Sequence, residues 1–439
     1  MSSLLNDSPA VSPATLPREE LRDVIDLALW AGQLLLQWGA QSARVEETVH
    51  RLGTGLGCDW LDVFVSPSAL VVTTTSGHEF RTKTRRVVRF GGVNMSVMAA
   101  VTDLSYRLSA GELTRADVRR ELERIDKMPR FYDRWLTTAI VGLACAAFSQ
   151  LFGGDWVVFG VTFVASAVGF LVRYTLTLRH FNQLLVVLAT AAVAGSLASL
   201  GVRLGLGNQP TIALAASVLL LVPGVPLINS IEDLLEGHMV TGMARGVTGA
   251  LVSLSIASGL AIAMNVWGVR DPWPTFSAPP SVGLDALWAA IAALGFALLF
   301  NVPPRLLAYC AAVGAMGHAV RFVLIHSGWA AVSNLPIASF IAAATVGLAG
   351  AYLAPRHRVP SSIFTISGVI PMVPGTFAFG TMIGVLQLGG VLLPATSGSL
   401  TNLLSETATN GIKTGLLLAA LALGIALPTL LFRRIRPVV

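Results

Sequence analysis

Long, mainly apolar runs follow one another from Trp135 onward and limit what the chain can fold into. A helix needs about 20 mainly apolar residues to cross a bilayer, where its backbone must hydrogen-bond to itself. Ten runs of this kind follow one another: Trp135–Gly154, Trp156–Val172, Phe181–Val202, Leu204–Ile231, Gly246–Val269, Leu284–Pro304, Leu306–Ile325, Ala330–Leu353, Val359–Gly389 and Thr414–Phe432. The sequence therefore predicts an all-α polytopic membrane protein with about ten transmembrane helices.

Charged residues are distributed unevenly along the chain. Residues 1–134 carry 17 Lys+Arg and 17 Asp+Glu, whereas residues 135–439 carry 13 and 7. The excess of basic residues flanks the apolar runs, as expected of loops on the inner side of a membrane, and gives no reason to expect nucleic-acid binding. The three cysteines are isolated and have neither metal-ligand nor redox spacing.

A polar head precedes the apolar runs. Residues 1–17 have the Ser/Pro-rich composition of a disordered tail. Residues 18–134 combine amphipathic helical segments with three short β-branched runs, and Thr114 followed by Asp117 predicts a capping box at the start of the last helix. The sequence predicts a small α+β cytoplasmic domain over residues 18–134, which we expect to regulate or assemble rather than to translocate.

The basic residues between the apolar runs predict the orientation of the chain. Most of them flank alternate loops, which places the head and both termini on the cytoplasmic side. Residues 135–269 then form five spans, residues 270–283 a linker on the outer side, and residues 284–439 five more spans. Because five is odd, the second set enters the membrane from the opposite side, and the sequence predicts two inverted five-helix repeats.

The fourth run is interrupted by Pro223, Gly224 and Pro226, which remove backbone donors and loosen the helix. Polar residues that are costly at membrane depth follow within about two helical turns. A weaker copy of the break, Met372–Thr376, lies in the ninth run. The predicted substrate and proton pathway consists of Pro223, Gly224, Pro226, Asn229, Glu232, Asp233, Arg245, Pro374 and Gly375.

These residue types suit a zwitterionic substrate. The helix that restarts after Pro226 directs its N-terminal amides at the break, where they favour a carboxylate. Asn229 and unpaired carbonyls can orient a hydroxyl or an ammonium group. Glu232 and Asp233 are adjacent and repel each other unless one holds a proton, which suits proton coupling, and Arg245 can neutralise one of them.

Three segments resemble the threonine/serine exporter family: Arg44–Glu47, Met128-Pro129 before the first span, and the stretch from Pro223 to Gly246. The resemblance implies a transporter, not an enzyme, of the bacterial plasma (inner) membrane that exports L-threonine, L-serine or a related small metabolite. It implies protons as the coupling ion and no other cofactor. The resemblance also implies that the protein lies in a lipid bilayer, and it leaves open whether the chain forms a homo-oligomer.

Several alternatives stay open at this point. One is export of a dicarboxylate such as succinate, and another is a passive channel. A third is a membrane-embedded metal-dependent enzyme that uses Glu232, Asp233 and Glu236. His318 and Arg321, at helical spacing in the seventh run, either line the pathway or extend to the membrane surface.

Overall fold

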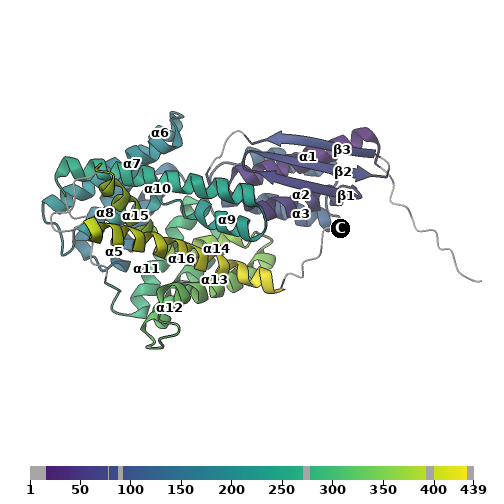
Figure 1. Cartoon of the computed structure of the whole chain (residues 1–439). Coiled ribbons are helices and arrows are strands. Elements are labelled where there is room, and N and C mark those ends of the chain that lie inside the picture. The colour runs from purple at the N-terminus through teal and green to yellow at the C-terminus, as the bar shows by residue number, and fades with distance from the viewer. Residues whose placement is uncertain (1–15, 78, 88–91, 270–276, 392–399, 433–439) are drawn as a thin grey trace, which may run out of the picture. The chain divides into compact units, whose positions relative to one another are not determined.

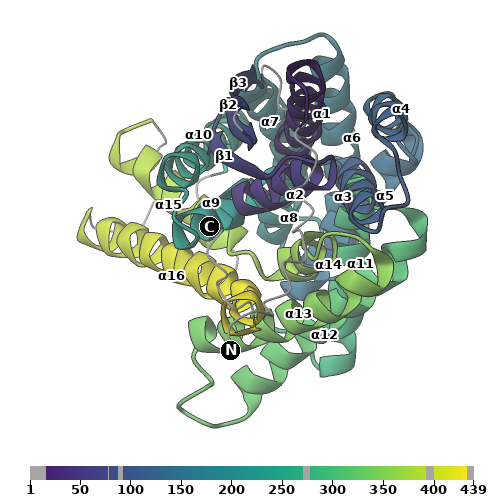
Figure 2. The same cartoon turned by 90° about the vertical axis from the view of Figure 1, so that its right-hand side faces the viewer.

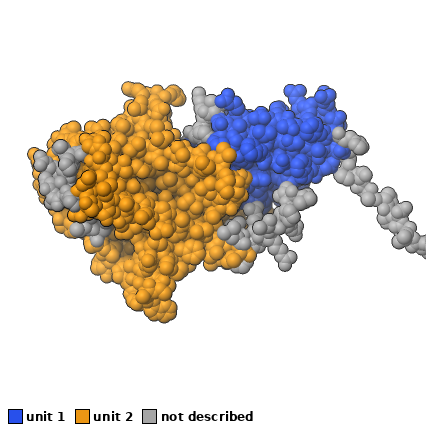
Figure 3. All heavy atoms as spheres, in the orientation of Figure 1, with its two compact units in different colours: residues 1–92, 97–128 blue, residues 93–96, 129–439 orange. Residues whose placement is uncertain are grey.

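The computed structural model describes residues 16–77, 79–87, 92–269, 277–391 and 400–432. They form two compact units (Figure 3): a head unit within residues 1–92 and 97–128, and a membrane unit within residues 93–96 and 129–439. Outside the described residues lie residues 1–15 of the predicted tail, residues 270–276 of the predicted linker and the C-terminal arginines.

The head unit is an α+β domain. Its elements are α1 (Arg18–Gln37), α2 (Ser42–Gly55), β1 (Trp60–Ser66), β2 (Ala69–Ser76), β3 (Glu79–Arg86), α3 (Met95–Ser109) and α4 (Arg115–Asp126). The strands form an antiparallel sheet in the order β1-β2-β3, with α1 packed on β2 and β3 and α2 on β1 (Figure 1). Alternate residues of β2 are buried, as a strand with one covered face requires.

Single residues determine two local features of the head, the start of α4 and the packing of α2. The capping box is confirmed: the Thr114 side chain accepts from the Asp117 amide, and the Asp117 side chain accepts from the Thr114 amide. The hydrogen bond from the Thr114 hydroxyl is the largest cause that lowers the pKa of Asp117 to about 2. Gly53 lies inside α2, where the absence of a side chain lets the helix pack closely against Leu61.

The regular secondary structure in the described residues of the membrane unit is helical. Its elements in the first half are α5 (Arg134–Leu151), α6 (Trp156–Leu178), α7 (Gln183–Arg203), α8 (Thr211–Ser217), η1 (Leu219–Leu221), α9 (Gly224–Leu235) and α10 (Met239–Trp267). The second half contains α11 (Val282–Leu299), η2 (Pro304–Leu306), α12 (Leu307–His326), α13 (Leu335–His357), α14 (Ser362–Val369), η3 (Ile370–Met372), α15 (Gly375–Leu388) and α16 (Leu400–Phe432).

Among the described residues, seven helices are long and apolar enough to cross a membrane, and nine if each of two bent helix pairs counts as one span. The protein is therefore a multi-pass membrane protein. The 18-residue helix α5 is outside this set, although it packs against α6, α8 and α11. A count of ten spans requires α5 as the tenth and stays a prediction.

The two Val-Pro-Gly sequences break their helices in the same way. The axis bends by 57° between η1 and α9 and by 56° between η3 and α15. At each break the glycine amide donates to the valine carbonyl two residues earlier, at 2.8 Å for Gly224 to Val222 and 2.7 Å for Gly375 to Val373. The intervening prolines have nearly equal dihedral angles, φ −77° and ψ 55° at Pro223 and φ −75° and ψ 51° at Pro374. Each break is thus an inverse γ-turn centred on proline.

Helix contacts repeat from one half of the membrane unit to the other. The pairs α5–α6, α6–α7, α7–α10 and α9–α10 have the counterparts α11–α12, α12–α13, α13–α16 and α15–α16 (Figure 2). Between the halves, α9 packs on α16 and α15 packs on α10. A glycine allows close backbone contact in both of the corresponding pairs α7–α10 and α13–α16. A Cβ at Gly259 of α10 would collide with the carbonyl of Leu188 in α7, and a Cβ at Gly424 of α16 would collide with the carbonyl of Phe340 in α13.

Two helices begin earlier than the apolar runs predict. α10 begins at Met239 and α16 at Leu400, whereas we expected spans from Gly246 and Thr414. A polar or charged residue ends an apolar run without ending a helix, because its backbone still forms the helical hydrogen bonds. As a result Arg245 and Lys413 lie within helices and not in loops.

Candidate functional site

A cavity of about 330 Å³ lies in the membrane unit where the two breaks meet. The first break contributes Leu219, Val222 and Gly224, and the second contributes the segment from Ile370 to Phe377. The breaks also touch: a Cβ at Gly224 would lie 3.5 Å from the Val373 side chain, and one at Gly375 2.7 Å from the Leu219 side chain. The volume lies at the lower end of the range for small-molecule pockets.

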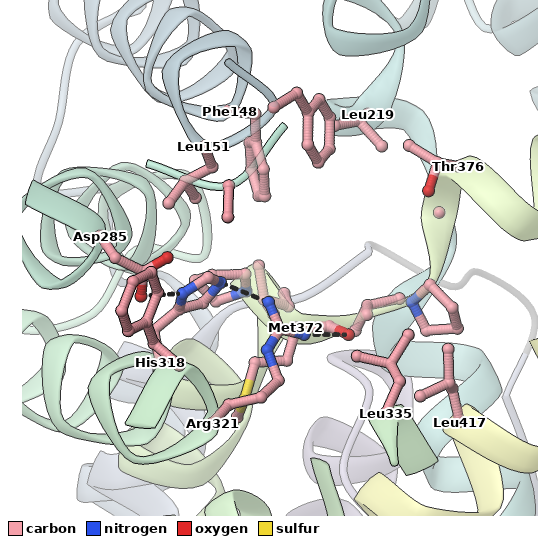
Figure 4. A pocket seen from close by; sticks show the side chains of 18 of the residues that line it. Phe148, Leu151, Leu219, Asp285, His318, Arg321, Leu335, Met372, Thr376 and Leu417 are labelled. Atoms are coloured by element: carbon pink, nitrogen blue, oxygen red, sulfur yellow. Dashed lines mark hydrogen bonds and ion pairs between the residues drawn. The ribbon is translucent and has the colours of Figure 1, made fainter. Parts of the chain in front are cut away.

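One wall of the cavity carries a chain of three charged or titratable side chains (Figure 4). Asp285 lies in the first turn of α11, and His318 and Arg321 lie one turn apart on α12. His318 Nδ1 lies 2.6 Å from Asp285 Oδ2, and Arg321 Nη2 lies 2.6 Å from His318 Nε2. Arg321 Nη1 also donates to the backbone oxygen of Met372 at 3.5 Å, which ties the chain to the second break.

The hydrogen-bond partners assign the tautomer of His318. A guanidinium only donates hydrogen bonds, so His318 Nε2 must accept from Arg321. The remaining proton then lies on Nδ1 and is donated to the Asp285 carboxylate. Asp285 and His318 are 3% and 5% exposed, so a neutral imidazole joins a buried carboxylate to a guanidinium.

The rest of the cavity wall is mainly apolar. Figure 4 shows Phe148, Leu151 and Leu219 across the cavity from the polar chain, and Thr376, Leu335 and Leu417 to one side. Among the described residues that line the cavity, Asp285 and Arg321 carry the permanent charges. The site therefore offers one anion and one cation in apolar surroundings.

The predicted site residues separate into two groups. Gly224, Pro374 and Gly375 line the cavity. The others do not: Pro223 lies in the break, Pro226 in the first turn of α9, Asn229, Glu232 and Asp233 further along α9, and Arg245 in α10. The expectation that a helix restarts after Pro226 is wrong, because α9 begins at Gly224.

A direct ion pair joins α9 to α10. Arg245 Nη1 lies 2.9 Å from Asp233 Oδ2, and the exposed fractions of the two side chains are 16% and 0%. Asn229 and Glu232 are also buried, at 2% and 6% exposed, whereas Glu236 is exposed at the end of α9. We call Asn229, Glu232, Asp233 and Arg245 the α9–α10 cluster.

Asp285 was missed by the sequence analysis. A signal was available, since it is an acid close to the start of an apolar run, where a carboxylate is costly. Its partnership with His318, 33 positions further along, had no sequence signal. Of the two alternatives left open for His318 and Arg321, the structure shows both side chains lining the cavity.

Comparison with known proteins gives the family. A family model of threonine/serine exporters matches residues 26–267, more than half of the chain, and a second threonine/serine exporter model matches residues 285–431. The chain belongs to the threonine/serine exporter family. No solved structure matches it.

Individual relatives of this exporter carry different descriptions. A protein of Klebsiella aerogenes described as a probable succinate transporter subunit is 40% identical over 97% of its own length and 58% of this chain. An uncharacterized protein of Haemophilus influenzae is 27% identical over 97% of this chain and all of its own length. A probable threonine/serine exporter of Mycobacterium tuberculosis is 24% identical over 88% of this chain and 74% of its own length.

The metal-dependent alternative finds no support in the part of the chain that the structure describes. There, no group of three or more His, Cys, Asp or Glu side chains is placed to hold a metal ion. The acids of the α9–α10 cluster include Asp233, which is paired with an arginine. The relatives with an assigned function are described as transporters or exporters.

Proposed function

We propose that the protein is a proton-driven secondary exporter of small hydroxy amino acids, L-threonine and L-serine, which bind in the cavity between the two breaks. The observation that carries the proposal is the presence of Asp285 and Arg321 on one wall of an otherwise mainly apolar cavity. An amino-acid zwitterion needs one anion and one cation, and both are present.

The backbone at the breaks supports the same substrate. Gly375 and Thr376, at the start of α15, line the cavity, and the positive end of the helix dipole there favours a carboxylate. Proline-broken helices near the middle of a bundle are typical sites of substrate binding in transporters with repeats. The repeated contacts of the two halves fit an inverted pair that moves one half against the other.

The predicted topology indicates on which side of the membrane the cavity lies. The cavity is bordered by the end of α5, the end of α12 and Ser277–Pro279, all on the outer side if the head is cytoplasmic. The α9–α10 cluster then lies toward the inner side. In this proposal the structure represents an outward-facing state, with the buried Asp233 as the proton carrier.

A dicarboxylate such as succinate is the second candidate. It is favoured by the description of the Klebsiella aerogenes relative, at 40% identity over 58% of this chain. The cavity favours it less, because a dianion would meet one guanidinium and also the Asp285 carboxylate among the described lining residues.

Flux in liposomes that contain the purified full-length chain tests the proposal. Labelled threonine is placed outside and unlabelled threonine at the same concentration inside, and an inside-acid pH gradient is imposed. A proton antiporter moves substrate into the acid compartment, so we expect accumulation above equilibrium that a protonophore abolishes. Succinate is run in parallel. Simple equilibration would show a channel, and accumulation of succinate but not threonine would replace the amino-acid proposal by the dicarboxylate one.

A further inference from the structure

We propose that Arg321 binds the carboxylate of the transported molecule, and that Asp285 and His318 are positioning residues that hold its guanidinium at the cavity wall. The assignment rests on the proposed function, since it requires that the cavity accept a small carboxylate. Amino acids and dicarboxylates share that chemical group.

The contacts of Arg321 leave it able to bind a ligand. Its side chain donates to His318 Nε2 and to the Met372 carbonyl, the latter at the long distance of 3.5 Å. A guanidinium carries more N–H donors than these two contacts use. Because Arg321 lines the cavity, its remaining donors can reach a polar ligand that occupies the cavity.

The charge arrangement keeps Arg321 from being neutralised directly. Asp285 compensates its charge from the far side of the His318 ring, and the neutral imidazole accepts a single hydrogen bond from the guanidinium. No carboxylate of a described residue lies within ion-pair distance of Arg321. Its planar fork, which matches a carboxylate through two parallel hydrogen bonds, stays available to the substrate.

Two other features favour a carboxylate at this place. The start of α15, at Gly375 and Thr376, lies on the same cavity and adds the positive end of a 14-residue helix. The mainly apolar wall opposite strengthens any charge interaction by lowering the local dielectric. Among the described residues that line the cavity, the one titratable group besides Asp285, His318 and Arg321 is His326, whose Nδ1 lies 2.8 Å from the Phe322 carbonyl oxygen.

Binding to the full-length protein in detergent tests the assignment. Calorimetry compares threonine, threonine methyl ester, which lacks the carboxylate charge, and succinate. We expect the parent protein to prefer threonine to its ester, and Arg321→Gln to weaken threonine binding by roughly 10- to 150-fold, the range for one hydrogen bond to a charged group. Arg321→Gln should bind threonine and ester alike. Arg203→Gln, at an exposed arginine that ends α7, is the matched control and should bind as the parent does.

Arg321→Lys keeps the positive charge but cannot form the two parallel hydrogen bonds of a guanidinium. It provides a second test if Arg321→Gln does not fold. It should retain a preference for threonine over the ester but bind threonine more weakly than the parent. Equal binding of acid and ester by the parent, or unchanged threonine binding by Arg321→Gln, overturns the assignment. Succinate binding that depends on Arg321, without threonine binding, would support the assignment and reject the amino-acid proposal. A parent that binds none of the three ligands would reject both.

Discussion

The two halves of the membrane unit share one helix arrangement but carry different polar groups. The first half has the α9–α10 cluster, in which Asp233 and Arg245 form a direct ion pair outside the cavity. The second half has Asp285, His318 and Arg321 on α11 and α12, inside the cavity. Corresponding helices therefore do not carry corresponding chemistry.

The spacing of the charges explains the difference in role. In the first half the carboxylate and the guanidinium satisfy each other at 2.9 Å, which leaves little for a ligand and suits a structural lock or a proton site. In the second half an imidazole separates the two charges, so both stay accessible from the cavity. We interpret the first arrangement as a lock between α9 and α10 and the second as a binding site.

The largest effect is expected from Asp233→Asn. The neutral amide can neither cycle a proton nor pair with the Arg245 charge, so gradient-driven accumulation of threonine should be lost. Because Asp233 lies outside the cavity, threonine binding measured by calorimetry should stay within about threefold of the parent. Near-normal accumulation by this variant would show that Asp233 has no part in coupling.

Stability separates the lock from the binding site. Arg245→Met removes the positive charge that pairs with the buried Asp233 and should lower the free energy of unfolding by about 3–5 kcal/mol. The double variant Asp233→Leu/Arg245→Met should recover most of that loss. The measurement is unfolding of the full-length protein in detergent, and additive losses in the double variant would contradict a coupled pair.

The two breaks differ in how much space they leave. A Cβ at Gly375 would lie 2.7 Å from Leu219 and 3.2 Å from Val222, whereas one at Gly224 would meet Val373 at an ordinary 3.5 Å. Gly375→Ala should therefore reduce transport several-fold and Gly224→Ala should be mild, while a leucine at either position fills the cavity and stops transport. Transport rates of the four variants in liposomes test this order, and a more severe effect of Gly224→Ala than of Gly375→Ala would reverse it.

Much of the fold is predictable from local sequence. Apolar runs locate the membrane helices, and the Val-Pro-Gly sequences locate both bends, because proline removes a donor wherever it occurs. The sequence predicts the cavity through the backbone at Gly224, Pro374 and Gly375, and it leaves His318 and Arg321 as one of two alternatives. The acids of α9 lie away from the cavity because of how α9 packs against α10 and α16, which local sequence does not specify. In the same way, the pairing of Asp285 with His318 depends on how α11 packs against α12.

The central claim, that substrate occupies the cavity between the breaks, is tested most directly by alkylation of Thr376→Cys. Thr376 lines the cavity at the start of α15, and the three native cysteines are buried. Glu236→Cys, at the exposed end of α9, is the control. We predict that saturating threonine slows maleimide labelling of Thr376→Cys and leaves Glu236→Cys unchanged. Labelling of Thr376→Cys at the same rate with and without threonine, in a variant that still transports, would contradict the account.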